Sequence, residues 1–145
     1  GEIMDMMVVN TQTLKDNPAL GKALTGAWFE VVELMNAKNT ASKSALEHMA
    51  KASGTDLAGF QAQLDTTKLF ATPQEALAFS TSKQLPETMH KIAEFSFQHG
   101  LLGEDAKDTS AVGMAFANGV TSGDKGNLKL RFDPSYVQMA ADAKL

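Results

Sequence analysis

The segment from Asn17 to Met35 constrains the fold most, because its pattern predicts a long amphipathic helix. Apolar residues recur there at helical spacing, at Leu20, Leu24, Ala27, Trp28, Val31 and Met35. Asn17 suits the N-cap, and Pro18 suits the first helical position, where a missing N–H costs no hydrogen bond. Trp28 is the only tryptophan, and burying a tryptophan removes roughly 200 Å² of surface from water. The pattern therefore predicts a helix at 18–38, with Trp28 as a packing anchor.

Caps and apolar spacing predict several further helices. Thr72-Pro73-Gln74-Glu75 is the clearest local signal, because a threonine cap, a proline at the first position and a glutamate at the third form a capping box. One turn of helix is expected at 11–16. The remaining helices are expected at 41–53, 56–64, 73–82, 86–98 and 134–143.

Two short segments have strand patterns. Residues 3–9 form a continuous apolar run that is typical of a buried strand. Residues 127–132 alternate well enough for a second short strand, and they follow a glycine-rich stretch with turn signals at Asn118-Gly119 and Gly123-Asp124. The expected fold class is mainly α, with one strand at 3–9 and a short strand near 127–132. At this length, residues 1–145 form a single domain or a fragment.

Composition excludes several classes of function. The chain has 145 residues, a net charge of −4 and no cysteine, which excludes disulfides, thiolate metal sites and a cysteine nucleophile. Nucleic-acid binding needs clustered basic residues, whereas the lysines are scattered and Arg131 is the only arginine. We therefore expect no nucleic-acid partner.

Residue types that carry catalysis or bind metals form no strong motif. The three histidines, at positions 48, 90 and 99, lack metal-binding spacing. Glu30 and Glu33 lie three residues apart on one helix, where a solvated face is favoured over a catalytic pair. Glu104, Asp105 and Asp108 suggest weak calcium binding but lack the alternating ligand spacing of a calcium loop. We therefore expect no enzyme activity, no metal site and no cofactor.

A resemblance to a known protein family lies in the order of several segments along the chain rather than in any single motif. The stretches that carry the resemblance are Asp5-Met6-Met7-Val8-Val9, Leu14 to Leu20, Ala27-Trp28, Ala50 to Gly54, Leu85 to Thr88, His99 to Leu102, and Leu130 to Asp133. Together they resemble the C-terminal part of periplasmic solute-binding proteins of ABC transporters, in the taurine, nitrate and aliphatic-sulfonate group.

The resemblance implies a C-terminal fragment of a two-lobed α/β type II periplasmic-binding fold. The whole protein would bind a small nitrogen- or sulfur-containing solute and pass it to an ABC permease, and this part would supply framework rather than pocket. It would be periplasmic, with a signal peptide upstream. The resemblance places Asp5 at the cleft-facing end of the family's strand, which makes it the candidate ligand contact, although a structural role in capping or hinge hydrogen bonding is favoured.

Two further expectations concern partners. A strand at 3–9 without the rest of its sheet has unpaired edges, which predicts a homodimer through this strand. The alternative to the transport function is a free-standing α-helical domain that binds a protein partner or regulates it.

Overall fold

The computed structural model describes residues 3–145. Within these residues the chain forms seven α-helices and a small three-stranded sheet, which confirms the mainly α fold class. The helices are α1 (Thr11–Asp16), α2 (Pro18–Asn36), α3 (Thr40–Ala52), α4 (Leu57–Asp65), α5 (Pro73–Ser80), α6 (Gln84–Gln98) and α7 (Ser135–Ala141).

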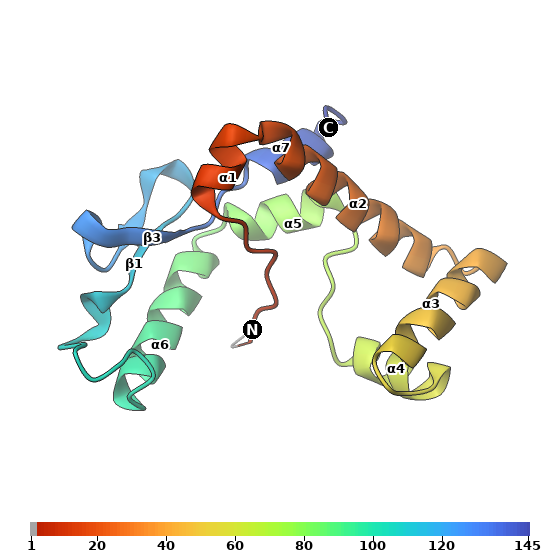
Figure 1. The fold of residues 1–145 in the computed structure, drawn as a ribbon, viewed down its shortest axis with the longest axis horizontal. Helices are drawn as coiled ribbons and strands as arrows, with labels where there is room; N and C mark the ends of the chain where they lie inside the picture. Colours follow the sequence, from red (N-terminus) through yellow and green to blue (C-terminus); the bar gives the residue numbers. More distant parts are fainter. Residues whose placement is uncertain (1–2) are drawn as a thin grey trace.

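The elements are arranged as an open arch (Figure 1). Helices α1, α2, α5 and α7 lie along the top, where α7 packs against both α2 and α5. Helix α6 and the sheet form one limb, and α3 packed against α4 forms the other. The segment before α1 descends between the two limbs (Figure 1).

The sheet is built from β1 (Gly113–Ala115), β2 (Thr121–Ser122) and β3 (Leu128–Arg131). Its order is β2-β1-β3, with β2 antiparallel and β3 parallel to β1. The strand expected near 127–132 is confirmed as β3. Strands β1 and β2 were expected to be loop, because strands of two or three residues are too short to show alternation.

Local capping signals place most helices to within two residues. The Thr72 hydroxyl accepts a hydrogen bond from the Glu75 amide at 3.2 Å, and the Glu75 carboxylate accepts one from the Ala71 amide at 2.9 Å. Asn17 is a correction, because its side chain makes no capping hydrogen bond at the start of α2. Asn10 caps α1 instead, by accepting from the amides of Gln12 and Thr13.

The expected strand at 3–9 is wrong. Residues 4–10 have no regular secondary structure, and no backbone hydrogen bond joins residues 3–9 to another described residue. The side chains of Ile3 and Val8 are 91% and 74% exposed. An apolar run becomes a strand only where its backbone pairs with a neighbouring strand, and residues 3–9 make no such hydrogen bonds to the described residues.

The main core lies in the limb that contains α6. Its buried residues come from α6 and the β1 region, and they are Leu85, Met89, Ala93, Met114 and Phe116. The Phe116 ring stacks on Phe132, with centroids 5.0 Å apart and the planes 6° from parallel. Met4 packs against this cluster from the N-terminal segment, together with Leu130 of β3. The beginning of the chain is therefore held beside β3.

Helix α2 forms as expected but buries a different face. Trp28 is 46% exposed and Val31 is 40% exposed, whereas Gly21 and Val32 are buried. Helices α7 and α3 pack against α2, and α7 approaches closely at Gly21, where α2 has no side chain. The expectation that Trp28 anchors the core is therefore wrong.

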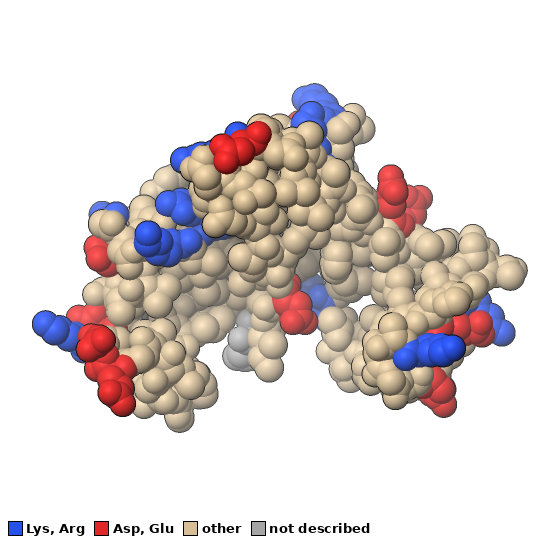
Figure 2. Space-filling model, in the orientation of Figure 1, with Lys and Arg blue, Asp and Glu red and all other residues tan. Residues whose placement is uncertain are grey.

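The arch exposes far more surface than a compact protein of this mass. Its accessible surface is 9981 Å², whereas a compact monomer of 15.5 kDa exposes about 7,200 Å². Figure 2 shows the underside hollowed between the two limbs. Much of the surface that a closed fold buries is open to solvent here.

Candidate functional site

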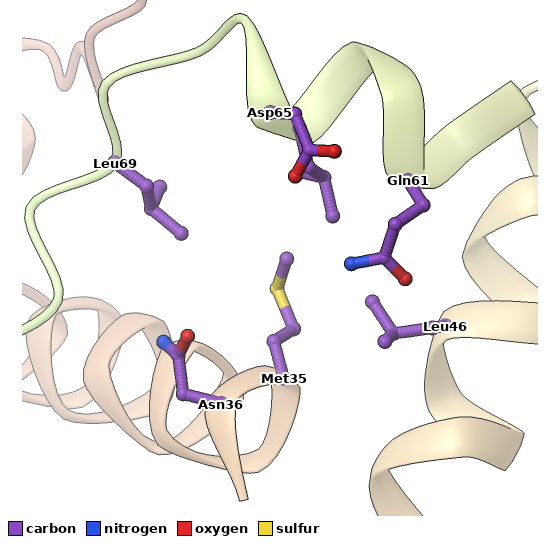
Figure 3. Close-up of a pocket in the computed structure, with 7 residues that line it drawn as sticks. Met35, Asn36, Leu46, Gln61, Asp65 and Leu69 are labelled. Atoms are coloured by element: carbon purple, nitrogen blue, oxygen red, sulfur yellow. The ribbon is translucent and has the colours of Figure 1, made fainter. Parts of the chain in front are cut away.

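One depression lies where α3 and α4 meet the end of α2 (Figure 3). It has a volume of about 180 Å³. The residues that line it come from α2, α3, α4 and the segment after α4, and they are Met35, Asn36, Leu46, Gln61, Leu64, Asp65 and Leu69. In Figure 3 the Met35 side chain points into the space from α2, and Gln61 and Asp65 border it from α4.

Hydrogen bonds at the junction of α2 and α3 fix this depression. The Ser42 hydroxyl is buried and donates to the Met35 carbonyl at 2.9 Å. The Asn39 side chain caps α3 by accepting from the Ser42 amide at 2.9 Å. The Asn36 amide nitrogen donates to the Val32 carbonyl at 2.8 Å. The Ser42–Met35 bond joins the last turn of α2 to the first turn of α3, and the other two bonds hold the facing ends of these helices.

The depression is small, and apolar and polar residues line it in similar proportion. Sites for small molecules typically enclose about 300–1,000 Å³, which exceeds its 180 Å³. Its polar residues are Asn36, Gln61 and Asp65, and all three are exposed at the surface. These lining residues supply no nucleophile with an adjacent base.

The structure places Asp5, the candidate ligand contact, away from this depression. Asp5 lies in the extended N-terminal segment, where its side chain is exposed. The carboxylate has no hydrogen-bond or ion-pair partner among the described residues. The chain itself therefore builds no ligand pocket around Asp5.

The histidines and acidic residues singled out from sequence are dispersed. His90 Nε2 lies 3.3 Å from the Glu94 carboxylate, and the His99 ring lies against Phe95 with centroids 4.1 Å apart. His48 is exposed on α3. Between residues 3 and 145, no group of three or more His, Asp or Glu side chains is arranged to hold a metal ion.

The acidic loop after α6 has a local structural role. Asp108 caps the following 3-10 turn (Thr109–Ala111) by accepting from the Ser110 amide at 2.7 Å. Hydrogen bonds from the Ser110 hydroxyl and amide lower the pKa of Asp108 below its ordinary value. This carboxylate stabilises a turn and lies at no depression described above.

Neither the geometry of this depression nor the composition of the helices identifies the class of protein to which the chain belongs. None of the helices in the described part of the chain is both long and apolar enough to span a membrane. Comparison with protein-family models, with curated proteins and with solved structures finds no match to this chain.

Proposed function

We propose that this chain is the C-terminal portion of the substrate-binding component of an ABC importer for a small nitrogen- or sulfur-containing solute. In this proposal the chain supplies framework rather than pocket. The observation that carries it is the accessible surface of 9981 Å², about 2,800 Å² more than a compact monomer of this mass exposes. A framework that the rest of a larger protein normally covers exposes such an excess of accessible surface when it is taken alone.

Exposed apolar side chains support the proposal. The extended segment before α1 exposes Ile3, Met6, Met7 and Val8, and α2 exposes Trp28, Val31 and Leu34. Exposed apolar surface on this scale usually marks a place where another surface packs. A segment of sheet at 3–9 and a second lobe beside α2 would cover these residues in the whole binding protein.

The order of elements also supports the proposal. An extended apolar segment precedes a long proline-initiated helix with Ala27-Trp28, and in the solute-binding proteins that the sequence resembles a strand leads to such a helix. Asp5 remains the residue of this chain proposed to contact the solute.

The proposed mechanism is closure of two lobes around the solute, followed by delivery to the permease. We place the whole protein in the periplasm, with a signal peptide upstream of the present sequence. The chain takes no catalytic part and needs no cofactor in this proposal.

A thermal-shift screen tests the proposal. Urea, simple amides, nitrate, taurine and alkanesulfonates are each added to the 145-residue chain and to the complete gene product that contains it. We expect one solute class to raise the melting temperature of the complete product, and to raise that of the chain alone much less or not at all. Equal stabilisation of the chain alone by the same solute would contradict a framework role.

The alternative is a free-standing α-helical interaction domain, which the exposed apolar surface also suits. The mass of the gene product in its native cells separates the two. A product of about twice this mass or more supports the transport proposal, and a product close to 15.5 kDa favours the interaction domain.

A further inference from the structure

A second depression lies between the N-terminal part of α1 and the edge of the sheet. It has a volume of about 640 Å³. Its polar lining residues are Asn10, Thr11, Gln12 and Lys15 from the start of the chain, and Lys129 and Arg131 from β3. Strand β3 is an edge strand, so the depression is open to solvent along one side.

Positive charge dominates this depression. Lys129 and Arg131 are exposed on one face of β3, while Leu128 and Leu130 turn inward. Lys15 adds a third cation from α1, and none of the described lining residues is Asp or Glu. Figure 2 shows Lys and Arg side chains gathered over the region of α1 and β3. The chain as a whole carries −4, so this local excess opposes the overall charge.

The side chains between these cations offer mainly hydrogen-bond donors. The Asn10 carboxamide oxygen already accepts from the amides of Gln12 and Thr13, at 2.9 and 3.1 Å, so its amide nitrogen is left to donate. The Thr11 hydroxyl oxygen accepts from Arg131 Nη1 at 3.4 Å, which leaves its O–H to donate.

Gln12 is the exception among the polar lining residues. Its amide nitrogen donates to the Asp16 carboxylate at 2.8 Å, so its amide oxygen remains an acceptor. The Asp16 carboxylate does not line the depression. Among the lining side chains, three cations, one hydroxyl and one amide nitrogen are therefore available as donors, and the Gln12 amide oxygen is an uncharged acceptor.

We propose that this depression binds the dianionic phosphate group of a small phosphomonoester. A phosphate group has only acceptor oxygens and two negative charges, which matches a lining of donors with a local charge of +3. Arg131 can bind two phosphate oxygens through its planar guanidinium, while the lysines act as point charges.

The wall of the depression indicates what the phosphate is attached to. Val8 and Val9 line it beside the polar groups, and the volume exceeds that of a bare phosphate ion. An apolar group on the ester would contact these valines. An extended nucleic acid is disfavoured, because its binding needs many clustered cations, whereas the chain as a whole carries −4.

Phenyl phosphate titrated into the 145-residue chain, followed by amide chemical shifts, tests the proposal. We expect saturable one-to-one binding at pH 7.5, with shifts concentrated at residues 8–15 and 129–131. Benzenesulfonate has a similar shape and one charge less, so it should bind at least fivefold more weakly. Absence of saturable shifts at these residues would overturn the proposal.

Variants that each remove one positive charge distinguish binding at this depression from general electrostatic attraction to the chain. Arg131→Gln and Lys129→Gln should each weaken phenyl phosphate binding at least tenfold. Lys51→Gln, which removes the same charge from α3 in the other limb, should change the affinity less than twofold. Equal weakening in all three variants would mean that only net charge matters. Lys129→Gln alone decides the question if Arg131→Gln fails to fold.

The prediction stands apart from the transport proposal, because it is measured on this chain with a phosphate ester. A negative solute screen would leave it unchanged.

Discussion

Gly21 of α2 lies against the phenol end of the Tyr136 ring of α7, so closely that a Cβ on Gly21 would overlap the ring atoms. This contact joins two helices from opposite ends of the sequence. The absence of a side chain at Gly21 lets α7 pack onto α2, and it sets which face of α2 is buried.

Gly21→Ala should destabilise the fold by about 1–3 kcal/mol, because the added methyl group overpacks a tight contact. Urea unfolding followed by circular dichroism measures this change. Gly26→Ala in the same helix is the control, because its Cβ would meet only Leu145 Cδ1 at 3.7 Å. That variant should gain about 0.5–1 kcal/mol from helix propensity. A gain in stability for both variants would contradict the Gly21–Tyr136 contact.

Thr72→Ala should cost about 1 kcal/mol of unfolding free energy, because it removes the cap of α5. Chemical denaturation gives the difference from the parent chain. Thr40→Ala is a matched change at the start of α3, where Asn39 supplies the cap. It should alter stability by less than about 0.5 kcal/mol. Equal losses in the two variants would show that the Thr72 cap contributes nothing specific.

Asp142 should titrate below its ordinary pKa of 3.8, because it accepts hydrogen bonds from Lys144 and Gln138. A lowered pKa in the folded state means that these bonds stabilise the fold above pH 3.8. That contribution is lost as the pH falls through the lowered value. Lys144→Gln should raise the Asp142 pKa in a carboxyl NMR titration and leave Asp108 unchanged. An unmoved Asp142 pKa would contradict the Lys144 contact.

The isolated chain should associate through residues 3–9, because this segment exposes apolar side chains and unpaired backbone. Sedimentation velocity should show a dimer whose population rises with concentration. Met6→Lys and Val8→Lys should shift the chain toward monomer. Leu145→Lys, a similar change at another exposed residue, should leave the dimer in place. A monomer at every concentration would rule out this association.

Helix positions were largely predictable because helices carry their own start and stop signals. The capping box at Thr72 and the Asn39–Thr40 break placed α5 and α3 without knowledge of the rest of the fold. The buried face of α2 was not predictable in the same way. Gly21 contributes no apolar side chain to a periodic pattern, yet its lack of a side chain decides where α7 packs.

Features that depend on distant parts of the chain were missed. The strand at 3–9 was expected from its apolar residues, but a strand also needs a neighbour, which no local pattern reveals. The scattered lysines gave no sign that Lys15 and Lys129 border the same depression. The α2–α4 depression likewise combines residues whose spacing carries no motif.

Hydrogen exchange at residues 3–9 tests the framework proposal most directly. The amides of this segment are measured in the 145-residue chain at a concentration where it is monomeric, and in the complete gene product. If the segment is a sheet strand of a larger binding protein, its amides should exchange rapidly in the chain and at least a hundredfold more slowly in the complete product. Equally rapid exchange in both would contradict the proposal that this chain is the framework of a two-lobed receptor.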